Sequence, residues 1–405
     1  MNASTTSSTA EHSRLVRGML NLAHAVDHLF LLIFAAAVAT IAVDFGFSKW
    51  EDLMPYGAGA FLLFGLGSVP SGRFGDLWGR RSMMLIFFFG IGAAALLTAL
   101  TQNAWQMAAS LTLLGAFASI YHPVGIPMLI ERSSNPGASI GFNGLAGNLG
   151  VAAAALVTGF LIKWLGWRAA FAIPGVVCIA CGVLFAWACP HETESPSKRK
   201  GGAKVTLSPA MMARAMLVMT AAAVTSSVLF NFTTNGNGQL ITERFRGVME
   251  DPATLGILLA VVYAVASIAQ VVVGNLVNRF ALKPFFLFMV LGQIPMLFLA
   301  SQTQGWWLFL SLTGVMIFVF GAIPFTDVMI ARYVDDRMRS RVSGIRLGVS
   351  FAVSSLSVWA IGPVVKAMGF GNSLLVLACF SLTTATILTL LPGASHEQAT
   401  PAQST

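Results

Sequence analysis

Four residues able to bind and release protons stand in apolar stretches of the sequence. His24, Asp27 and His28 have the spacing i, i+3, i+4, so a helix presents all three on one face. His122 stands in a separate apolar stretch, directly before Pro123. A carboxylate beside imidazoles forms a set whose protonation changes near neutral pH. The chemistry indicated first is therefore reversible proton binding. Metal binding by the same side chains is a less favoured alternative.

These residues are expected to meet near the middle of a membrane. With a helix starting near residue 18, Asp27 lies about 14 Å along its axis. Counting back from Glu131, His122 lies about 13 Å deep. Ionisable side chains at such depth usually face the interior of a helix bundle. We therefore predict that Asp27 and His122 lie close together. A static hydrogen-bonded brace made of the same residues is the structural alternative.

The composition places most of the chain in lipid. The 405 residues are 56% hydrophobic and only 10% charged, whereas a soluble domain carries about 25% charged residues. This excludes a large soluble enzyme, a disordered chain and a nucleic-acid-binding protein, although the net charge is +8. A membrane-spanning helix needs about 20 apolar residues. The apolar runs predict twelve such helices, at residues 18–42, 53–73, 83–101, 105–130, 138–162, 168–189, 211–241, 254–278, 284–302, 306–331, 341–363 and 370–391.

Basic residues predict how the chain is oriented, because cytoplasmic loops are enriched in Lys and Arg. Of the 24 Lys and Arg residues, most fall on the side of the N-terminus; the exceptions are Lys49, Lys163, Arg168, Arg244, Arg246 and Lys366. Both termini are therefore expected in the cytoplasm, and the protein in the inner (plasma) membrane. The predicted parts are a cytoplasmic tail (1–17), a six-helix bundle (18–189), a cytoplasmic linker (190–209), a second six-helix bundle (210–391) and a cytoplasmic tail (392–405).

The two halves of the sequence resemble each other. Residues 159–171 align with residues 362–374 at a shift of 203. A parallel repeat of six plus six helices implies two similar bundles with a binding site between them. The aligned pairs are Gly141 with Gly344, Gly159 with Gly362, Lys163 with Lys366, and Gly166 with Gly369.

A motif lies between the second and third predicted helices. Residues 72–81 read Gly-Arg-Phe-Gly-Asp-Leu-Trp-Gly-Arg-Arg. This segment resembles the signature cytoplasmic loop of the major facilitator superfamily, Gly-x-x-x-Asp-x-x-Gly-Arg-Lys/Arg, at every fixed position. The counterpart in the second half, residues 274–283, is degenerate. The resemblance covers the whole chain. It implies an all-α membrane fold of twelve helices in two pseudo-symmetric bundles, which rock about a central site.

The same loop predicts a latch between the halves. Asp76 is expected at the positive N-terminal end of the eleventh helix, which begins near Arg341. Arg80 is expected to pair with Glu131. Contacts of this kind hold one conformation and must break for the other to form. A solvated basic loop is the alternative. The predicted latch consists of Gly72, Asp76, Gly79, Arg80, Arg81 and Glu131.

Polar residues in the second half give further candidates. Asp327 and Arg346 have similar predicted depth and opposite charge, which predicts either an ion pair or an inner gate. On the seventh helix, Gly236 and Gly238 are expected to break the helix beside a polar stripe, and a broken polar helix points to a substrate path. A flexible helix end is the alternative. The stripe consists of Asn231, Asn235 and Gln239, with Tyr263 on the eighth helix as a weaker candidate.

A narrower resemblance suggests a task. His24 and Asp27, the triplet Tyr121-His122-Pro123, and the Gly-rich segment 141–150 resemble the fosmidomycin-resistance group, whose members look like exporters of small drugs, including a phosphonate. This chain departs from that group at His28, where the group tends to have Asp. It also lacks the Gly-Pro element on helix five that is linked with antiport.

The function expected from these features is proton-coupled export of a small drug-like or organic anionic compound by alternating access. The alternatives are proton-driven uptake of a carboxylate or phosphonate, and a membrane sensor on a carrier fold. A membrane enzyme is disfavoured, and no catalytic residue is assigned. The expected partners are the solute, protons and the lipid bilayer, without nucleic acid, for a monomer with no cofactor and no bound metal.

Overall fold

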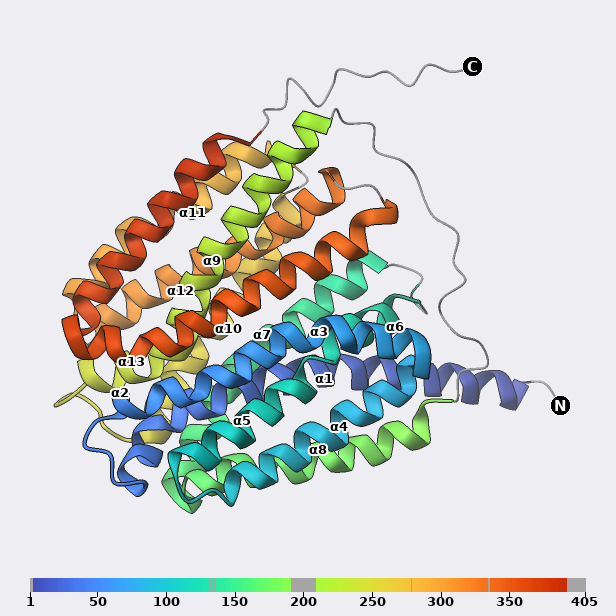
Figure 1. Ribbon diagram of the computed structural model, residues 1–405, viewed down its shortest axis with the longest axis horizontal. Helices are drawn as coiled ribbons and strands as arrows, with labels where there is room; N and C mark the ends of the chain where they lie inside the picture. The colour runs from blue at the N-terminus through green and yellow to red at the C-terminus, as the bar shows by residue number, and fades with distance from the viewer. Residues whose placement is uncertain are drawn as a thin grey trace.

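The computed structural model describes residues 3–131, 133, 136–190, 209–277, 279–333 and 336–391, with the side chains of some residues in these ranges left aside. The described secondary structure is helical (Figure 1). The first half contains α1 (Ala3–Asp44), α2 (Trp50–Leu53), η1 (Met54–Gly57), α3 (Ala58–Trp78), α4 (Arg80–Ala99), α5 (Ala104–Ala118), η2 (Tyr121–Gly125), α6 (Ile126–Glu131), α7 (Pro136–Leu165) and α8 (Trp167–Ala188). The second half contains α9 (Pro209–Arg244), α10 (Pro252–Leu276), α11 (Leu282–Gln302), α12 (Gly305–Tyr333) and α13 (Asp336–Thr389).

The described residues form 11 helical segments long and apolar enough to cross a membrane. One of them, residues 348–389 within α13, is 42 residues long. At 1.5 Å per residue a straight helix of that length would measure about 63 Å, twice the roughly 30 Å of a bilayer core. Gly369, with φ 75° and ψ 166°, interrupts α13 and turns the chain back. The segment therefore makes two crossings, in agreement with the predicted twelve.

The backbone repeats the symmetry found in the sequence. Gly166, which joins α7 to α8, has φ 84° and ψ 167°, close to the angles of Gly369. Only glycine adopts such angles without strain, so the aligned glycines make the same turn in both halves. The other ends of the two bundles also correspond. Arg81 donates to the carbonyl oxygens of Ala186 and Cys189 at the end of α8, and Lys283 donates to those of Thr389 and Leu391 at the end of α13.

The two halves pack against each other along two seams. One seam joins α7 to α10 and the other joins α3 to α13, while α1 also contacts α9. We call the end of the molecule where α1 begins and α8 ends the termini face, and the opposite end, where α1 and α7 end, the distal face. In Figure 1 the helices of the two halves diverge from the distal face, at the left, toward the termini face. Contacts between the halves hold the distal face closed.

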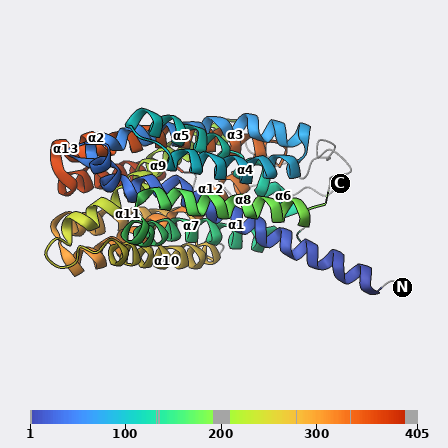
Figure 2. The same ribbon diagram turned by 90° about the horizontal axis from the view of Figure 1, so that it is seen from below.

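Three local expectations from the sequence differ from the structure. α1 begins at Ala3 instead of residue 18 and projects beyond the other helices at the termini face (Figure 2). α9 is one continuous helix through Gly236 and Gly238, so the predicted break is wrong; glycine lowers helix propensity by only about 1 kcal/mol, which packing overrides. The fourth crossing, in turn, contains the π-helical turn η2, which the sequence analysis did not anticipate.

Candidate functional site

Two elements of the first half position the titratable residues. α1 presents His24, Asp27 and His28 on one face, as their spacing predicts. η2 presents His122 immediately before Pro123. Proline lacks an N–H and its ring clashes with a carbonyl in the preceding helical turn, so the helix widens at this point into a π-helical turn. The widening places His122 against α1.

Asp27 is fully buried, with 0% of its surface exposed. Its Oδ2 lies 3.6 Å from His122 Nε2, slightly beyond hydrogen-bond distance. Among the described residues, neither oxygen of Asp27 has a hydrogen-bond partner, and neither does His122 Nε2. A buried carboxylate without a partner costs several kcal/mol if it is ionised. The site is therefore built to hold a proton or another cation.

The remaining histidines form a connected pair. His24 Nδ1 lies 2.7 Å from the backbone oxygen of Asn143 on α7. A carbonyl oxygen only accepts, so His24 Nδ1 carries the hydrogen and its Nε2 offers a lone pair. His28 Nε2 lies 3.2 Å from that atom and donates to it. The ring centroids of His24 and His122 are 5.0 Å apart, and those of His28 and His122 are 5.7 Å apart. We call Asp27 and these three histidines the His–Asp cluster.

A second layer of hydrogen bonds fixes the cluster. The Tyr121 hydroxyl donates to the backbone oxygen of Leu20 at 2.8 Å, and its ring stacks on His24 at 4.8 Å. The Asn143 amide donates to the Tyr121 hydroxyl at 2.7 Å and to Asn21 Oδ1 at 2.9 Å. Asn143 thus holds both His24 and Tyr121. The sequence analysis did not select it, although it lies in the quoted Gly-rich segment, where a single Asn among glycines was the available signal.

The cluster has a closed side and an accessible side. Asp27 and His24 are buried, while His28 and His122 are partly exposed. Phe64 of α3 packs against the His122 ring, with centroids 5.7 Å apart. Phe351 of α13, from the other half, packs against Phe64 at 4.4 Å. Protons can therefore reach Asp27 through His28 and His122, and one wall of the site comes from the second half.

The cluster also meets one geometric requirement of a metal site. One ring nitrogen from each of His24, His28 and His122 lies within 4.8 Å of the others. Three imidazoles with a neighbouring carboxylate are a common ligand set for divalent transition metals. These are the described residues best placed to hold a metal.

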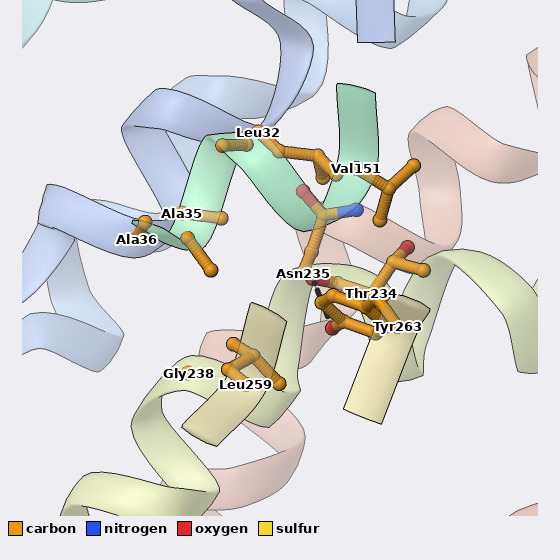
Figure 3. Close-up of a pocket in the computed structure, with 11 residues that line it drawn as sticks. Leu32, Ala35, Ala36, Val151, Thr234, Asn235, Gly238, Leu259 and Tyr263 are labelled. Carbon is orange, nitrogen blue, oxygen red and sulfur yellow. Dashed lines mark hydrogen bonds between the residues drawn. The ribbon is translucent and has the colours of Figure 1, made fainter. Parts of the chain in front are cut away.

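A small cavity lies between the halves (Figure 3). Ala35 and Val151 line it from the first half, and Asn235, Leu259 and Tyr263 line it from the second. Its lining on α1 is displaced from Asp27 toward the distal face, since Ala35 stands eight residues, or about 12 Å, further along that helix. The cavity is therefore separate from the His–Asp cluster and lies on the predicted substrate path.

The polar stripe of α9 is buried and does not join the cluster. Asn231 donates to Ser354 Oγ of α13 at 2.7 Å, and Asn235 donates to the backbone oxygen of Asn231 at 3.0 Å. Gln239 donates across the seam to the backbone oxygen of Ala35 at 3.3 Å. Asn231 thus braces the second half, Asn235 reaches the cavity, and Gln239 joins the halves.

Comparison with known proteins identifies the family. The profile of the Major Facilitator Superfamily matches residues 20–242, which is more than half of the chain. The chain belongs to the Major Facilitator Superfamily. Two crystal structures of a bacterial homolog of the human lysosomal transporter Spinster have the same fold, both in an inward-facing conformation. The occupied form has a TM-score of 0.77 at 16% identity, covering 96% of this chain and 99% of that one. The unoccupied form has a TM-score of 0.75 at 15% identity, with the same coverage.

Two relatives are similar in sequence over shorter stretches. A probable hexose phosphate transport protein of Chlamydia pneumoniae is 28% identical over 160 residues, which is 37% of this chain and 33% of that protein. A probable actinorhodin transporter of Streptomyces coelicolor is 27% identical over 180 residues, which is 41% of this chain and 30% of that protein. The chain thus spans about a third of the length of these relatives. Together with the fold, these findings establish a multi-pass membrane transporter.

The superfamily loop lies at the termini face. Gly79 has φ 88°, which lets the chain turn from α3 into α4. Gly72 packs against Pro123 of η2, so the loop and the turn that carries His122 are in contact. Arg80 forms the expected ion pair with Glu131 at 2.7 Å. Both partners belong to the first half, as do Arg81 and its acceptors, so these contacts join helices of one bundle.

Three predicted positions remain apart from this geometry. Asp76 is exposed near the end of α3, and the segment near Arg341 to which the sequence assigns it lies outside the described side chains. The side chains of Asp327 and Arg346 also lie outside the described residues. A latch through Asp76 and a pair of Asp327 with Arg346 stay predictions.

Proposed function

We propose that this transporter exports a small drug-like or organic anionic compound by alternating access, in exchange for protons that bind at the His–Asp cluster. The observation that carries the proposal is the fully buried Asp27 carboxylate, unpartnered among the described residues and 3.6 Å from His122. A charge in that position is costly, so a proton resides there in one conformation and leaves in another. His28 and His122, being partly exposed, pass the proton to and from Asp27.

The proposal places the protein in the inner membrane as a monomer, with both termini in the cytoplasm. The distal face is then extracellular. The two bundles, residues 18–189 and 210–391, rock about the seam that contains the cavity of Figure 3. The domain limits at residues 1–17, 190–209 and 392–405 are the cytoplasmic tails and linker. This orientation rests on the excess of Lys and Arg on the side of the termini.

Transport in proteoliposomes tests the proposal. A pH gradient should drive accumulation of a compound from a panel of phosphonates, carboxylates and cationic drugs. Asp27→Asn should keep exchange of that compound at equal concentrations on both sides, yet lose accumulation driven by the gradient. Asp44→Asn is the matched control, because Asp44 lies on the same helix but pairs with Arg168 at the distal face. Gradient-driven accumulation by Asp27→Asn at the wild-type level would reject proton coupling at this site.

Uptake by proton symport is the second candidate for direction. The printed name of one relative, a hexose phosphate transport protein, favours an anionic metabolite as the solute. The name of the other, an actinorhodin transporter, favours a larger organic compound. In the same proteoliposomes, accumulation on the acidic side indicates antiport, and accumulation on the alkaline side indicates symport.

A metal in the cluster is the other occupant to distinguish. Elemental analysis of the purified protein, with His122→Ala for comparison, separates the two. A protein free of transition metal that still couples transport to protons fits the proposal. One equivalent of metal, lost in His122→Ala, would replace the proton by a metal ion.

A further inference from the structure

Two lysines occupy equivalent positions in the two halves at the distal face. Lys163 lies in the last turn of α7 and Lys366 in the aligned turn of α13. Each reaches across to the other half. Lys163 Nζ lies 2.8 Å from Asp251 Oδ1, just before α10. Lys366 Nζ lies 2.5 Å from Asp52 Oδ1, in α2. The two ion pairs are therefore related by the same symmetry that relates the halves.

A glycine stands one helical turn before each lysine. Gly159 and Gly362 precede the lysines by four residues, so glycine and lysine share a helix face. At both glycines the backbone of the other half comes so close that a Cβ would collide with a carbonyl oxygen, that of Pro252 for Gly159 and that of Glu51 for Gly362. Each glycine thus permits close approach at the point where its lysine forms the ion pair.

The acceptors are fixed on their own side. Asp251 Oδ2 accepts hydrogen bonds from the backbone N–H of Thr254 at 3.1 Å and from its hydroxyl at 2.7 Å. The carboxylate therefore caps α10 while its other oxygen faces Lys163. The hydrogen bond from Lys163 lowers the pKa of Asp251 below its usual value of 3.8. A lowered pKa keeps the carboxylate charged at every pH above that value, so the pair persists through the physiological range.

We propose that the two Gly-x-x-x-Lys motifs, with Asp251 and Asp52, form a symmetric clasp that closes the distal face and has to open in the alternate conformation. The proposal rests on the alternating-access part of the proposed function, and not on proton coupling. The glycines set the distance between the halves, and the lysines select the closed arrangement by charge. All four charged side chains are about 34–46% exposed, so each pair forms and breaks without a large desolvation cost.

The expected effect on the conformational equilibrium is modest for one pair and larger for two. An exposed ion pair changes an equilibrium by about fivefold at most. Lys163→Gln or Lys366→Gln should therefore shift the ratio of closed to open distal face by about twofold to fivefold. The double variant should shift it by roughly the product, up to about 25-fold. Gly159→Val or Gly362→Val, which obstructs the backbone approach, should open the face more than either lysine variant.

Distances between two spin labels across the distal face measure the clasp directly. Val43 and Val248 are exposed, at 78% and 56%, and belong to opposite halves. Both are replaced by Cys in a chain carrying Cys379→Ser, because Cys379 is exposed. The measurement is made at one pH without solute. The double lysine variant should gain a longer-distance population, and the exchanged pair Lys163→Asp with Asp251→Lys should remove most of the gain seen with Lys163→Asp alone.

The control is an ion pair of similar exposure within one half. Arg168 pairs with Asp44 at 2.7 Å on the same face, and both residues belong to the first half. Arg168→Gln should leave the distance distribution unchanged. An unchanged distribution in the double lysine variant would overturn the clasp, as would an equal shift in Arg168→Gln. Because the readout is a distance, failure of Asp27→Asn to uncouple transport would leave this result standing, and the reverse also holds.

Discussion

Replacing Asp27 by Asn should leave the protein as stable as the wild type or make it more stable. Both carboxylate oxygens lack hydrogen-bond partners among the described residues, and the nearest histidine nitrogen is 3.6 Å away. A buried polar group without a partner costs about 1–3 kcal/mol. The neutral amide removes the possibility of a buried charge, so the free energy of unfolding should stay equal or rise by up to about 3 kcal/mol.

This prediction separates a functional carboxylate from a structural brace. Removing one partner of a buried, well-formed ion pair costs about 3–5 kcal/mol, whereas the observed geometry predicts no such loss. Denaturation of the detergent-solubilised protein, followed by tryptophan fluorescence, compares Asp27→Asn with Asp44→Asn. Asp44 accepts from Arg168 at 2.7 Å and from Trp167 at 3.2 Å, so its variant should lose stability, by about 1 kcal/mol. A loss of 3 kcal/mol or more in Asp27→Asn would refute the reasoning and restore the brace.

Three further substitutions test the surroundings of the cluster and the repeat. Asn143→Ala removes two buried hydrogen bonds, including the one to Tyr121, and should lower the free energy of unfolding by about 1–3 kcal/mol in the same denaturation assay; no loss would mean that the second layer does not support the cluster. Arg81→Gln removes the donor to the end of α8 and should cost about 1–2 kcal/mol, without changing the label distances across the distal face; a changed distance would give Arg81 a role between the halves. Phe351→Ala uncovers His122 and should speed its modification by diethyl pyrocarbonate severalfold, as read by mass spectrometry; an unchanged rate would show that Phe351 is no wall of the site.

The fold could be predicted from the sequence because lipid imposes strong constraints on it. Apolar runs of about 20 residues mark the crossings, and the shift of 203 residues anticipates that Gly166 and Gly369 make the same turn. The proximity of Asp27 and His122 followed from depth alone, since buried ionisable groups face the bundle interior. These inferences use only the length of a helix and the cost of burying charge.

The remaining features depend on contacts that sequence spacing does not contain. The continuity of α9 through Gly236 and Gly238 depends on packing against its neighbours, which outweighs a weak local preference. The role of Asn143 depends on its backbone oxygen, which every residue has. The partners of Lys163 and Lys366 lie in segments that the repeat does not align, so the lysines could be matched from the sequence while the clasp could not.

The most direct test of the account follows protons themselves. Proteoliposomes containing the protein and a pH-sensitive dye report proton movement when the transported compound is added on one side. The wild type should move protons together with the compound, and Asp27→Asn should move the compound down its gradient without protons. Proton movement of wild-type size in Asp27→Asn, with the compound still transported, would contradict the assignment of the His–Asp cluster as the coupling site.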